Sequence, residues 1–407
     1  MSRKRYYPYL IFLLCFLIQG GILGIISNCR GLFYTPVCEE LGIGLGTFTA
    51  YSTFYGIALC ASIPLATKLV RQGNLRVVLT AGSVAIAATQ YAMSWFNAPW
   101  QWYLAAAVQG ICHAVLFIQT VPMLIHNWFA DRKGLFLGLA CSASGLVGAV
   151  MNRATERYMA LHGWRASYRM LGLVLFLLLV PACAAFSVRR PEDVGARPYG
   201  ADRVRAPTKA VQKDFQNFKR KHMVFGALAG YACLICLTVG YNQILFLLGL
   251  TFNHSSEQAS SFVSLAMIGT IVFKVSVGWL NDRFGAAAAC YLSGFGIAAG
   301  LLLLMMGQTT SFMLAGSLLM GMPMAVSIVV MPNLVRSVFG EQEFESRYKL
   351  LSILVNLSSN FSYSLIGWMI SVTSYQDTLA VGALVTAVAL LLSAIAFAIR
   401  KRSFVYE

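Results

Sequence analysis

Two basic side chains, Arg153 and Lys274, lie deep within long apolar stretches of this 407-residue sequence. A Lys or Arg at the centre of a membrane costs roughly 2.5–3.5 kcal/mol even on lenient insertion scales, so such a residue is a candidate for function. Glu156 is the acidic residue nearest to comparable depth. Because a lone cation in a low-dielectric cavity strongly favours a negative guest, the pattern predicts an anion-binding site.

The two cations differ in their surroundings. Lys274 is too deep to reach the membrane surface easily and has no carboxylate neighbour on its own helix. We therefore expect it to neutralise a bound anion at mid-membrane. Arg153 stands one helical turn before Glu156. It either pairs with Glu156 and extends outward to the interface, or it lines the transport path.

Polar residues within other apolar stretches extend the set of candidates. Asn356 and Asn360 are at i and i+4 and therefore share one helix face. His113 is, with Glu156, the titratable candidate for moving a proton. Each such group either contributes to a site or ties neighbouring helices together, since polar groups in lipid seek interhelical partners. The polar candidates are His113, Gln119, Tyr241, Asn242, Gln243, Asn356 and Asn360.

The elements that position these residues are membrane-spanning helices. The chain is 58% hydrophobic and 11% charged, against about 25% charged residues in soluble domains. About 20 apolar residues cross the ~30 Å hydrocarbon core, and the sequence offers about twelve such runs. We predict an all-α membrane protein with helices at 9–32, 46–68, 75–96, 100–126, 134–158, 166–187, 223–250, 258–280, 286–307, 311–335, 347–371 and 376–399.

The net charge of +16 is distributed by side of the membrane. Lys and Arg concentrate in the loops on the side that holds both termini, whereas the opposite side has only Arg30, Arg157, Arg165 and Arg169. This is the positive-inside bias, which predicts that both termini are cytoplasmic. The basic charge is thus explained by topology, and no nucleic-acid partner is expected.

A polar segment at 188–222 divides the predicted helices six and six. We expect an N-terminal six-helix bundle at 1–187, a solvated cytoplasmic linker at 188–222 with an amphipathic stretch at 208–221, and a C-terminal six-helix bundle at 223–407. Transporters of this organisation place substrate near mid-membrane between their repeats.

One loop carries a recognisable motif. Residues 278–285, between the eighth and ninth spans, read GWLNDRFG, and 66–73, between the second and third, read ATKLVRQG. The first resembles the G-x-L-x-D-R-x-G loop of the major facilitator superfamily, and the second is a degraded copy that keeps Arg71 and Gly73. The alternative is a plain charged turn. The resemblance implies a gating role for Gly278, Asp282, Arg283 and Gly285.

A longer stretch narrows the resemblance. Residues 122–165 contain Trp128-Phe129, Arg132-Lys133-Gly134 and Gly163-Trp164-Arg165 around a glycine-rich helix. This is similar to the signature of the monocarboxylate transporters and the oxalate–formate antiporter group, and it adds Arg132 and Lys133 to the gating candidates. Gly31-Leu32-Phe33-Tyr34 and Glu39-Glu40-Leu41-Gly42 resemble the start of the same group. The resemblance makes Arg30 and Tyr34 candidates for substrate contact; for Arg30 the alternative is an interfacial anchor.

The resemblance also assigns a role to the eighth span. Family members carry a substrate-binding cation four residues before the first Gly of the loop motif, which is Lys274 here. The monocarboxylate branch has an Asp four residues earlier, where this chain has Thr270, and the antiporter branch has a Lys in the eleventh span, which is absent. Arg153 also departs from the family pattern. Neither charge pattern is complete, so anion exchange and proton symport both stay open.

These observations predict a carrier of a small organic anion, a monocarboxylate, that works by alternating access in a cell membrane, such as a bacterial inner membrane. Its partners would be the anion, the lipid bilayer, and coupling protons or a counter-anion. A multidrug exporter would be expected to show a membrane-buried acid, and a non-transporting membrane sensor is the other alternative. We find no nucleophile–base grouping or metal-ligand spacing, so we expect no enzyme, metal or cofactor.

Overall fold

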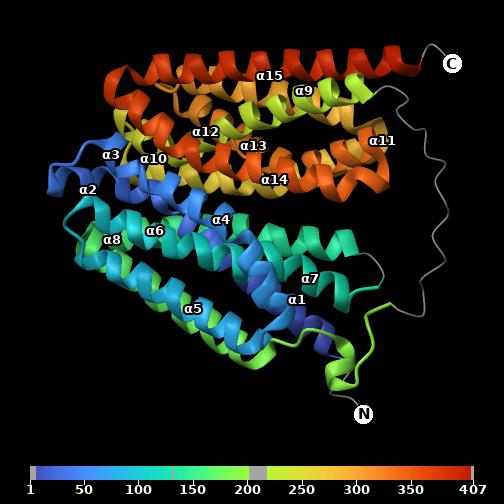
Figure 1. Ribbon diagram of the computed structural model, residues 1–407. Helices are drawn as coiled ribbons and strands as arrows, with labels where there is room; N and C mark the ends of the chain where they lie inside the picture. The colour runs from blue at the N-terminus through green and yellow to red at the C-terminus, as the bar shows by residue number, and fades with distance from the viewer. Residues whose placement is uncertain (1–5, 131–132, 201–217, 405–407) are drawn as a thin grey trace. The chain divides into compact units, whose positions relative to one another are not determined.

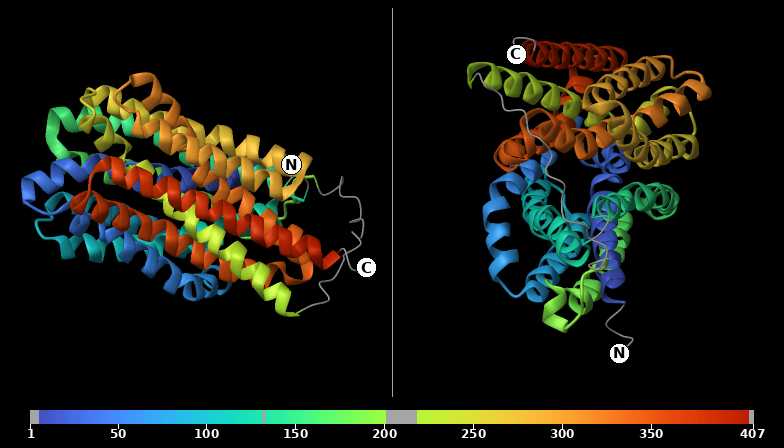
Figure 2. Two further views of the ribbon diagram at one scale, coloured as in Figure 1. Left: turned by 90° about the horizontal axis from the view of Figure 1, so that it is seen from above. Right: turned by 90° about the vertical axis from the view of Figure 1, so that its right-hand side faces the viewer.

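The computed structural model describes residues 6–130, 133–200 and 218–404, which are almost entirely helical (Figure 1). Of residues 133–135, 218–220, 282, 341, 342, 345 and 400–404 only the backbone is described. Contacts divide the chain into two units, Met1–Pro207 and Thr208–Glu407. The division falls inside the segment that the sequence predicts to be a linker. Within each unit the helices are long rods that lie alongside one another (Figure 2).

The first unit contains the elements that the apolar runs predict, with short irregular turns between them. Pro99 occupies the first position of α6, and the Asn74 side chain accepts hydrogen bonds from the first amides of α5. Its elements are α1 (Tyr7–Gln19), η2 (Gly20–Ser27), η3 (Arg30–Phe33), α2 (Tyr34–Leu41), α3 (Leu45–Thr49), α4 (Tyr51–Gln72), α5 (Leu75–Ala92), η4 (Met93–Trp95), α6 (Pro99–His113), η5 (Ala114–Gln119), α7 (Thr120–Trp128), α8 (Lys133–Phe186) and η6 (Pro191–Val194).

The second unit follows the same principles. Ser255 caps α11 with its side chain, and Gln258 Oε1 accepts a hydrogen bond from the Ser255 amide at 3.0 Å. The elements are α9 (Phe218–Leu237), η8 (Thr238–Gly240), α10 (Tyr241–Thr251), α11 (Ser256–Met305), α12 (Thr310–Leu319), α13 (Met322–Ala325), η9 (Val326–Val330), α14 (Met331–Val372) and α15 (Tyr375–Phe404).

Three long helices are each two helices joined at a glycine. Gly163 in α8, Gly285 in α11 and Gly340 in α14 have φ of +77°, +84° and +74°, a conformation that L-residues with a side chain rarely adopt. The described residues contain 11 apolar segments long enough to cross a membrane, and the segment Phe136–Phe186 spans 51 residues and includes the Gly163 turn. The multi-span helical class is confirmed, while the count of twelve and the cytoplasmic termini stay predictions.

The first and fourth apolar segments of each unit are interrupted in a corresponding way. In the first unit the interruptions are the π-helical turns η2 and η5, and in the second they are the 3₁₀ turn η8 and the π-helical turn η9. Such turns inside helices are frequent at functional sites. Interrupted spans in matching positions of two halves are also the usual location of a transporter's binding site. The interruptions therefore select four spans for closer inspection.

Close helix packing in the first unit depends on small residues. A Cβ atom added to Gly110 of α6 would collide with the Tyr55 carbonyl oxygen and lie 3.0 Å from the Leu59 amide nitrogen of α4. A Cβ at Gly24 would lie 2.9 Å from Val147 Cβ of α8. Small residues at such crossings let membrane helices approach closely, so these two glycines set how near α4 and α8 come to their neighbours.

The described part of the predicted linker, residues 188–200, makes hydrogen bonds to the helices before it. The Val188 carbonyl accepts a hydrogen bond from Trp128 Nε1 at 3.0 Å. Arg189 Nη2 donates to the carbonyls of Val70 and Gly73 at 2.9 and 2.5 Å, and Tyr199 forms an isolated β-bridge with Phe129. The unsatisfied carbonyls at helix ends explain this docking. Most of the predicted amphipathic stretch 208–221 lies outside the described residues.

Candidate anion-binding site

Arg30 is the most deeply buried arginine among the described side chains, with 5% of its surface exposed. It begins η3, just after the π-helical turn η2, so the break in the first span turns its side chain into the helical core of the unit. Its Nε donates to the Ile26 carbonyl at 3.1 Å and its Nη1 to Ser52 Oγ at 3.4 Å. The guanidinium carbon lies 4.3 Å from the ring centre of Tyr55 and 5.3 Å from that of Tyr51. These cation–π contacts partly compensate for lost hydration.

A small cavity adjoins Arg30 within the first unit. The space between its lining atoms is about 250 Å³, a volume that includes space open to solvent. Polar lining comes from Arg30, Tyr51, Gln90, Gln109 and Tyr168. Gln109 Nε2 donates to Gln90 Oε1 at 3.0 Å, so the two amides hold each other in place. A buried cation, amides and phenols around one cavity form a polar site suited to an anion.

His113 also contacts Tyr55. Its Nδ1 is 2.5 Å from the Tyr55 hydroxyl oxygen, and its ring centre is 5.3 Å from that of Phe117. The imidazole is 5% exposed, and its Nε2 has no hydrogen-bond partner in the part of the chain that the structure describes. Because His113 directly precedes η5, the interruption in the fourth span positions it. Arg30, Tyr55 and His113 therefore form one cluster in which Tyr55 contacts both others.

The second unit buries Lys274, at 8% exposure on α11. One turn earlier, Thr270 is buried and donates its hydroxyl to the Ala266 carbonyl at 3.1 Å. Asn242, which follows the η8 interruption, is 3% exposed, and both side-chain atoms of its amide lack hydrogen-bond partners among the described residues. An unsatisfied buried amide is costly, so Asn242 is the strongest polar candidate in this unit.

Asn356 and Asn360 share a helix face as expected, but their amide groups serve their own helix. Asn356 Nδ2 donates to the Ser352 carbonyl and Asn360 Nδ2 to the Asn356 carbonyl, each at 2.8 Å. Tyr34 is fully buried, and its ring meets Phe48 edge-on with the centres 6.0 Å apart. Local hydrogen bonds account for the amide groups of Asn356 and Asn360, and ring packing accounts for the position of Tyr34.

The Arg153 side chain is exposed on α8. An apolar sequence run fixes neither which helix face a residue occupies nor what covers that face, so its depth in a membrane, and whether it pairs with Glu156 or lines the path, stay predictions. Arg30, predicted to lie at the outer end of its span, is buried among the helices of the first unit.

The loop motif contains one turn and several aromatic contacts. Gly285 forms the turn with φ of +84°. Gly278 is an ordinary helical residue, and a Cβ atom added to it would lie 3.6 Å from Val329 Cγ1. Arg283 is exposed, and its guanidinium lies 5.4 Å from the ring centre of Trp279. The side chains of Asp282 and Lys133 are not described, and Arg132 lies outside the described residues, so the gating role of these residues stays a prediction.

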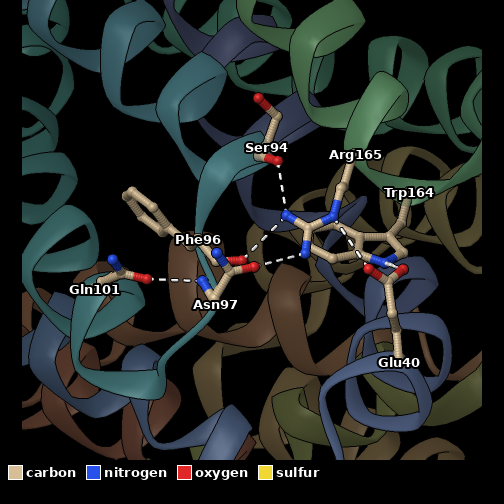
Figure 3. A network of polar contacts seen from close by, with 7 residues as sticks. All are labelled: Glu40, Ser94, Phe96, Asn97, Gln101, Trp164 and Arg165. Carbon is tan, nitrogen blue, oxygen red and sulfur yellow. Dashed lines mark hydrogen bonds and ion pairs between the residues drawn. The ribbon is translucent and has the colours of Figure 1, made fainter.

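A polar cluster that the sequence motifs contain, but whose geometry they do not reveal, joins Glu40 to Trp164 and Arg165 (Figure 3). Trp164 Nε1 donates to Glu40 Oε2 at 2.5 Å, and Arg165 Nε donates to Glu40 Oε1 at 3.1 Å. Arg165 Nη1 also donates to the carbonyls of Ser94 and Phe96, and Nη2 to Asn97 Oδ1 at 2.7 Å. We call Glu40, Trp164 and Arg165 the clasp, because they tie α2, the loop after η4, and α8 together.

Comparison with known proteins identifies the family. The sequence model of the Major Facilitator Superfamily matches residues 9–255 and 235–404. The chain belongs to the Major Facilitator Superfamily. The all-helical fold expected from the resemblance is therefore confirmed.

Individual relatives of this superfamily member refine the picture. It is 26% identical over 302 residues to the MFS-type transporter pynF of Aspergillus niger, covering 70% of this chain and 63% of that protein. It is 23% identical over 344 residues to monocarboxylate transporter 12-B of Danio rerio, covering 77% and 71%. With monocarboxylate transporter 4 of Rattus norvegicus it shares 24% identity, covering 46% and 40%. The chain thus spans under two thirds of the fungal and rat relatives. The predicted resemblance to the monocarboxylate transporter group is confirmed.

Solved structures agree on the fold. The nucleoside transporter NupG superposes with a TM-score of 0.70 at 13% identity, covering 98% of this chain and 99% of that one. A bacterial homolog of the human lysosomal transporter Spinster, in an inward-facing and occupied conformation, gives 0.70 at 12% identity, covering 100% and 98%. At such identities the likeness concerns the fold alone. In the described residues, no group of three His, Cys, Asp or Glu is placed to hold a metal ion.

Proposed function

We propose that this superfamily member carries a small organic anion, a monocarboxylate, across a cell membrane by alternating access. The observation that carries the proposal is the set of buried ionic groups. Arg30 in the first unit and Lys274 in the second are buried, whereas no Asp or Glu is buried among the described side chains. Buried charges that are retained within membrane helices mark substrate or ion pathways.

The sign of these charges selects the substrate class. A buried cation is stabilised by an anion that enters the low-dielectric interior, since the attraction between them is much stronger there than in water. A cationic drug would instead meet repulsion from Arg30 and Lys274. The guanidinium fork also matches a carboxylate bidentately. The names of the monocarboxylate transporters among the relatives support the same class.

Arg30, Lys274 and Asn242 have proposed tasks. In the first unit, Arg30 would attract the carboxylate. In the second unit, Lys274 would do so, and the unsatisfied amide of Asn242 would hydrogen-bond a polar group of a substrate there. The proposal assigns no substrate contact to His113, Tyr34, Asn356, Asn360 or Arg153, and their binding role stays a prediction from the sequence. Location in a bacterial inner membrane also belongs to it.

The proposal can be tested by uptake into proteoliposomes. We would measure initial uptake of labelled acetate, lactate, pyruvate and benzoate, with uridine and tetraphenylphosphonium as neutral and cationic probes. We expect uptake of at least one carboxylate and of neither other probe. Lys274→Ala should reduce carboxylate uptake by roughly 10- to 100-fold, the loss of one charge-assisted contact.

The matched control is Lys349→Ala, which removes an exposed lysine from the same unit. It should transport like the wild type. Uptake of tetraphenylphosphonium without carboxylate uptake would favour a cation exporter instead. Full carboxylate transport by a folded Lys274→Ala protein would remove Lys274 from the site.

A further inference from the structure

We propose that His113 carries a proton that is coupled to the anion, and that the coupling operates through Tyr55 to Arg30. This inference rests on the proposed function, because it needs an anion to be bound at Arg30. It selects proton symport from the two coupling modes that the charge pattern leaves open.

The geometry makes His113 suited to hold a proton. The imidazole is buried, contacts the Tyr55 hydroxyl through Nδ1, and has no partner for Nε2 in the described part of the chain. If the Tyr55 hydroxyl donates to Nδ1, the neutral ring carries its proton on Nε2. If Nδ1–H donates to the Tyr55 oxygen, the Nε2 lone pair is free to accept a proton.

Both tautomers lead to the same cation. A proton from water adds either to Nε2 or, once the Tyr55 O–H has rotated away, to Nδ1. The product is an imidazolium whose Nδ1–H donates to the Tyr55 oxygen. The new N–H bond replaces an O–H bond of hydronium, and transfer of the proton back to water on the other side of the membrane restores the neutral ring.

Arg30 links this proton to the anion. Its guanidinium stacks on the same Tyr55 ring, with the carbon 4.3 Å from the ring centre. Two cations that contact the same buried tyrosine repel each other strongly. A carboxylate that binds Arg30 neutralises one of them and so favours the protonated form of His113. By linkage, a proton on His113 favours anion binding by the same factor.

Few other ionisable groups in the first unit can compete for this role. Arg30 from η3 and Tyr55 from α4 are the charged and titratable groups that face His113 among the described residues. The other cations of the helices packed against it, Lys68, Arg71 and Arg76, lie at the far end of α4 or the start of α5. The pair Tyr55–His113 is also held rigidly, because Gly110 brings α6 against the backbone of α4.

The test separates proton coupling from transport. Full-length protein in liposomes would be assayed with labelled acetate, lactate, pyruvate and benzoate in two modes: uptake driven by an alkaline interior, and counterflow against the same unlabelled anion without a gradient. Protein-free liposomes measure passive entry of the neutral acids. We expect wild-type protein to show both modes, with internal pyranine reporting proton entry alongside the anion.

His113→Gln should still show counterflow but lose gradient-driven accumulation by roughly tenfold or more, a typical coupling factor. Tyr55→Phe keeps the ring for Arg30 and removes the hydroxyl, so we expect a smaller loss of the same kind; it also serves if His113→Gln does not fold. The matched control is His162→Gln. His162 is exposed and stacks on Tyr158 with the ring centres 4.4 Å apart. His162→Gln therefore also removes a His–Tyr contact, but at an exposed position instead of a buried one.

The outcomes distinguish the two proposals. Gradient-driven accumulation by His113→Gln at the wild-type level would place the proton elsewhere and overturn the inference. Wild-type counterflow without any response to the gradient would show an exchanger, which also overturns the inference but leaves the proposed function standing. A wild-type protein that moves none of the four carboxylates would overturn both.

Discussion

Two arginines in the first unit show how differently the same side chain can be used. Arg165 in the clasp donates to one carboxylate, two backbone carbonyls and an amide oxygen, and its side chain is 30% exposed. Arg30 is buried, and its contacts include aromatic faces, one carbonyl and one hydroxyl. The clasp pairs its cation with Glu40. The Arg30 contacts named above are instead with neutral groups.

This difference indicates which of the two guanidinium groups can gain free energy by binding an anion. A guanidinium that is already paired with a carboxylate gains little from a second anion, whereas one surrounded by phenols and amides keeps its attraction for a negative guest. We therefore assign structural work to Arg165 and substrate binding to Arg30. The following predictions test that division, beginning with the largest expected effect.

Arg30→Gln should abolish most transport while the protein still folds. Loss of a charge-assisted contact with the carboxylate corresponds to about 1.5–3 kcal/mol, or roughly 10- to 100-fold in uptake. The measurement is initial carboxylate uptake per folded molecule, with thermal unfolding in detergent as the check on folding.

Arg153→Gln provides the matched control, because it removes an exposed arginine from the same unit. We expect a much smaller change in uptake. If Arg153→Gln were as inactive as Arg30→Gln, or Arg30→Gln as active as the wild type, the assignment of the site to Arg30 would be wrong.

Gly110→Ala should disturb the Arg30 cluster from a distance. The added Cβ would collide with the Tyr55 carbonyl, so α6 must move away from α4 and take His113 with it. Overpacking of this kind costs about 1–3 kcal/mol, and we expect a lower unfolding temperature together with reduced uptake.

Gly138→Ala is the control, because a Cβ at this exposed helical position meets nothing within 4 Å. Ala is the better helix former, so stability should stay equal or rise slightly. Equal behaviour of the two variants would show that the close approach of α4 and α6 is not needed.

Arg165→Ala should lower stability and spare transport. It leaves the carbonyls of Ser94 and Phe96 without their donor, a cost of about 1–3 kcal/mol. Glu40→Gln should cost less, about 0.2–1 kcal/mol, because this ion pair is half-exposed. Thermal unfolding measures both, with Arg169→Ala, an exposed arginine one turn later, as the control.

Uptake per folded molecule should change little in either clasp variant. A large loss of transport at unchanged stability would contradict the division between the two arginines. It would instead make the clasp part of the transport cycle.

The contrast between the two arginines also shows what the sequence can predict. Runs of about 20 apolar residues predict spanning helices directly, because a bilayer imposes that length. Gly163 and Gly285 stand at junctions between helices. Both occur in sequence motifs, Gly163-Trp164-Arg165 and the loop motif at 278–285, that already indicate a break between spans. Burial of Arg30 could not be predicted, since it depends on the π-helical turn η2 and on phenol rings that another helix supplies.

Contacts between residues far apart in the chain could not be predicted from the sequence either. Trp164 and Glu40 both occur in motifs of the family resemblance, but their hydrogen bond joins residues 124 positions apart. Tyr55 was missed because an aromatic residue on an apolar helix is usually core. One signal was present: Tyr51 and Tyr55 stand at i and i+4, which places two phenols on one face of a predicted span.

The smallest effect concerns a third cation cluster, in the second unit, which resembles the clasp more than the Arg30 cluster. Glu343 pairs with Lys221, and its Oε2 accepts from Arg347 Nε at 3.2 Å. Partial burial alone would raise the pKa of the Glu343 carboxyl, but hydrogen bonds and charge from Lys221 and Arg347 hold that pKa below its ordinary value of 4.5. The stabilisation is thus complete above pH 4.5 and is lost as pH falls through the lower pKa of the folded state.

As the pH is lowered from about 5 to about 3, the unfolding temperature of the wild type should therefore fall more than that of Glu343→Gln. The difference should correspond to the free energy of a partly exposed ion pair, roughly 0.2–1 kcal/mol. Replacement of both Lys221 and Arg347 by Met should remove the same pH dependence while Glu343 remains. If Glu343→Gln showed the full wild-type slope, other carboxylates would account for the acid sensitivity. A cluster whose charges are mutually satisfied in this way should affect stability alone, as we expect of the clasp.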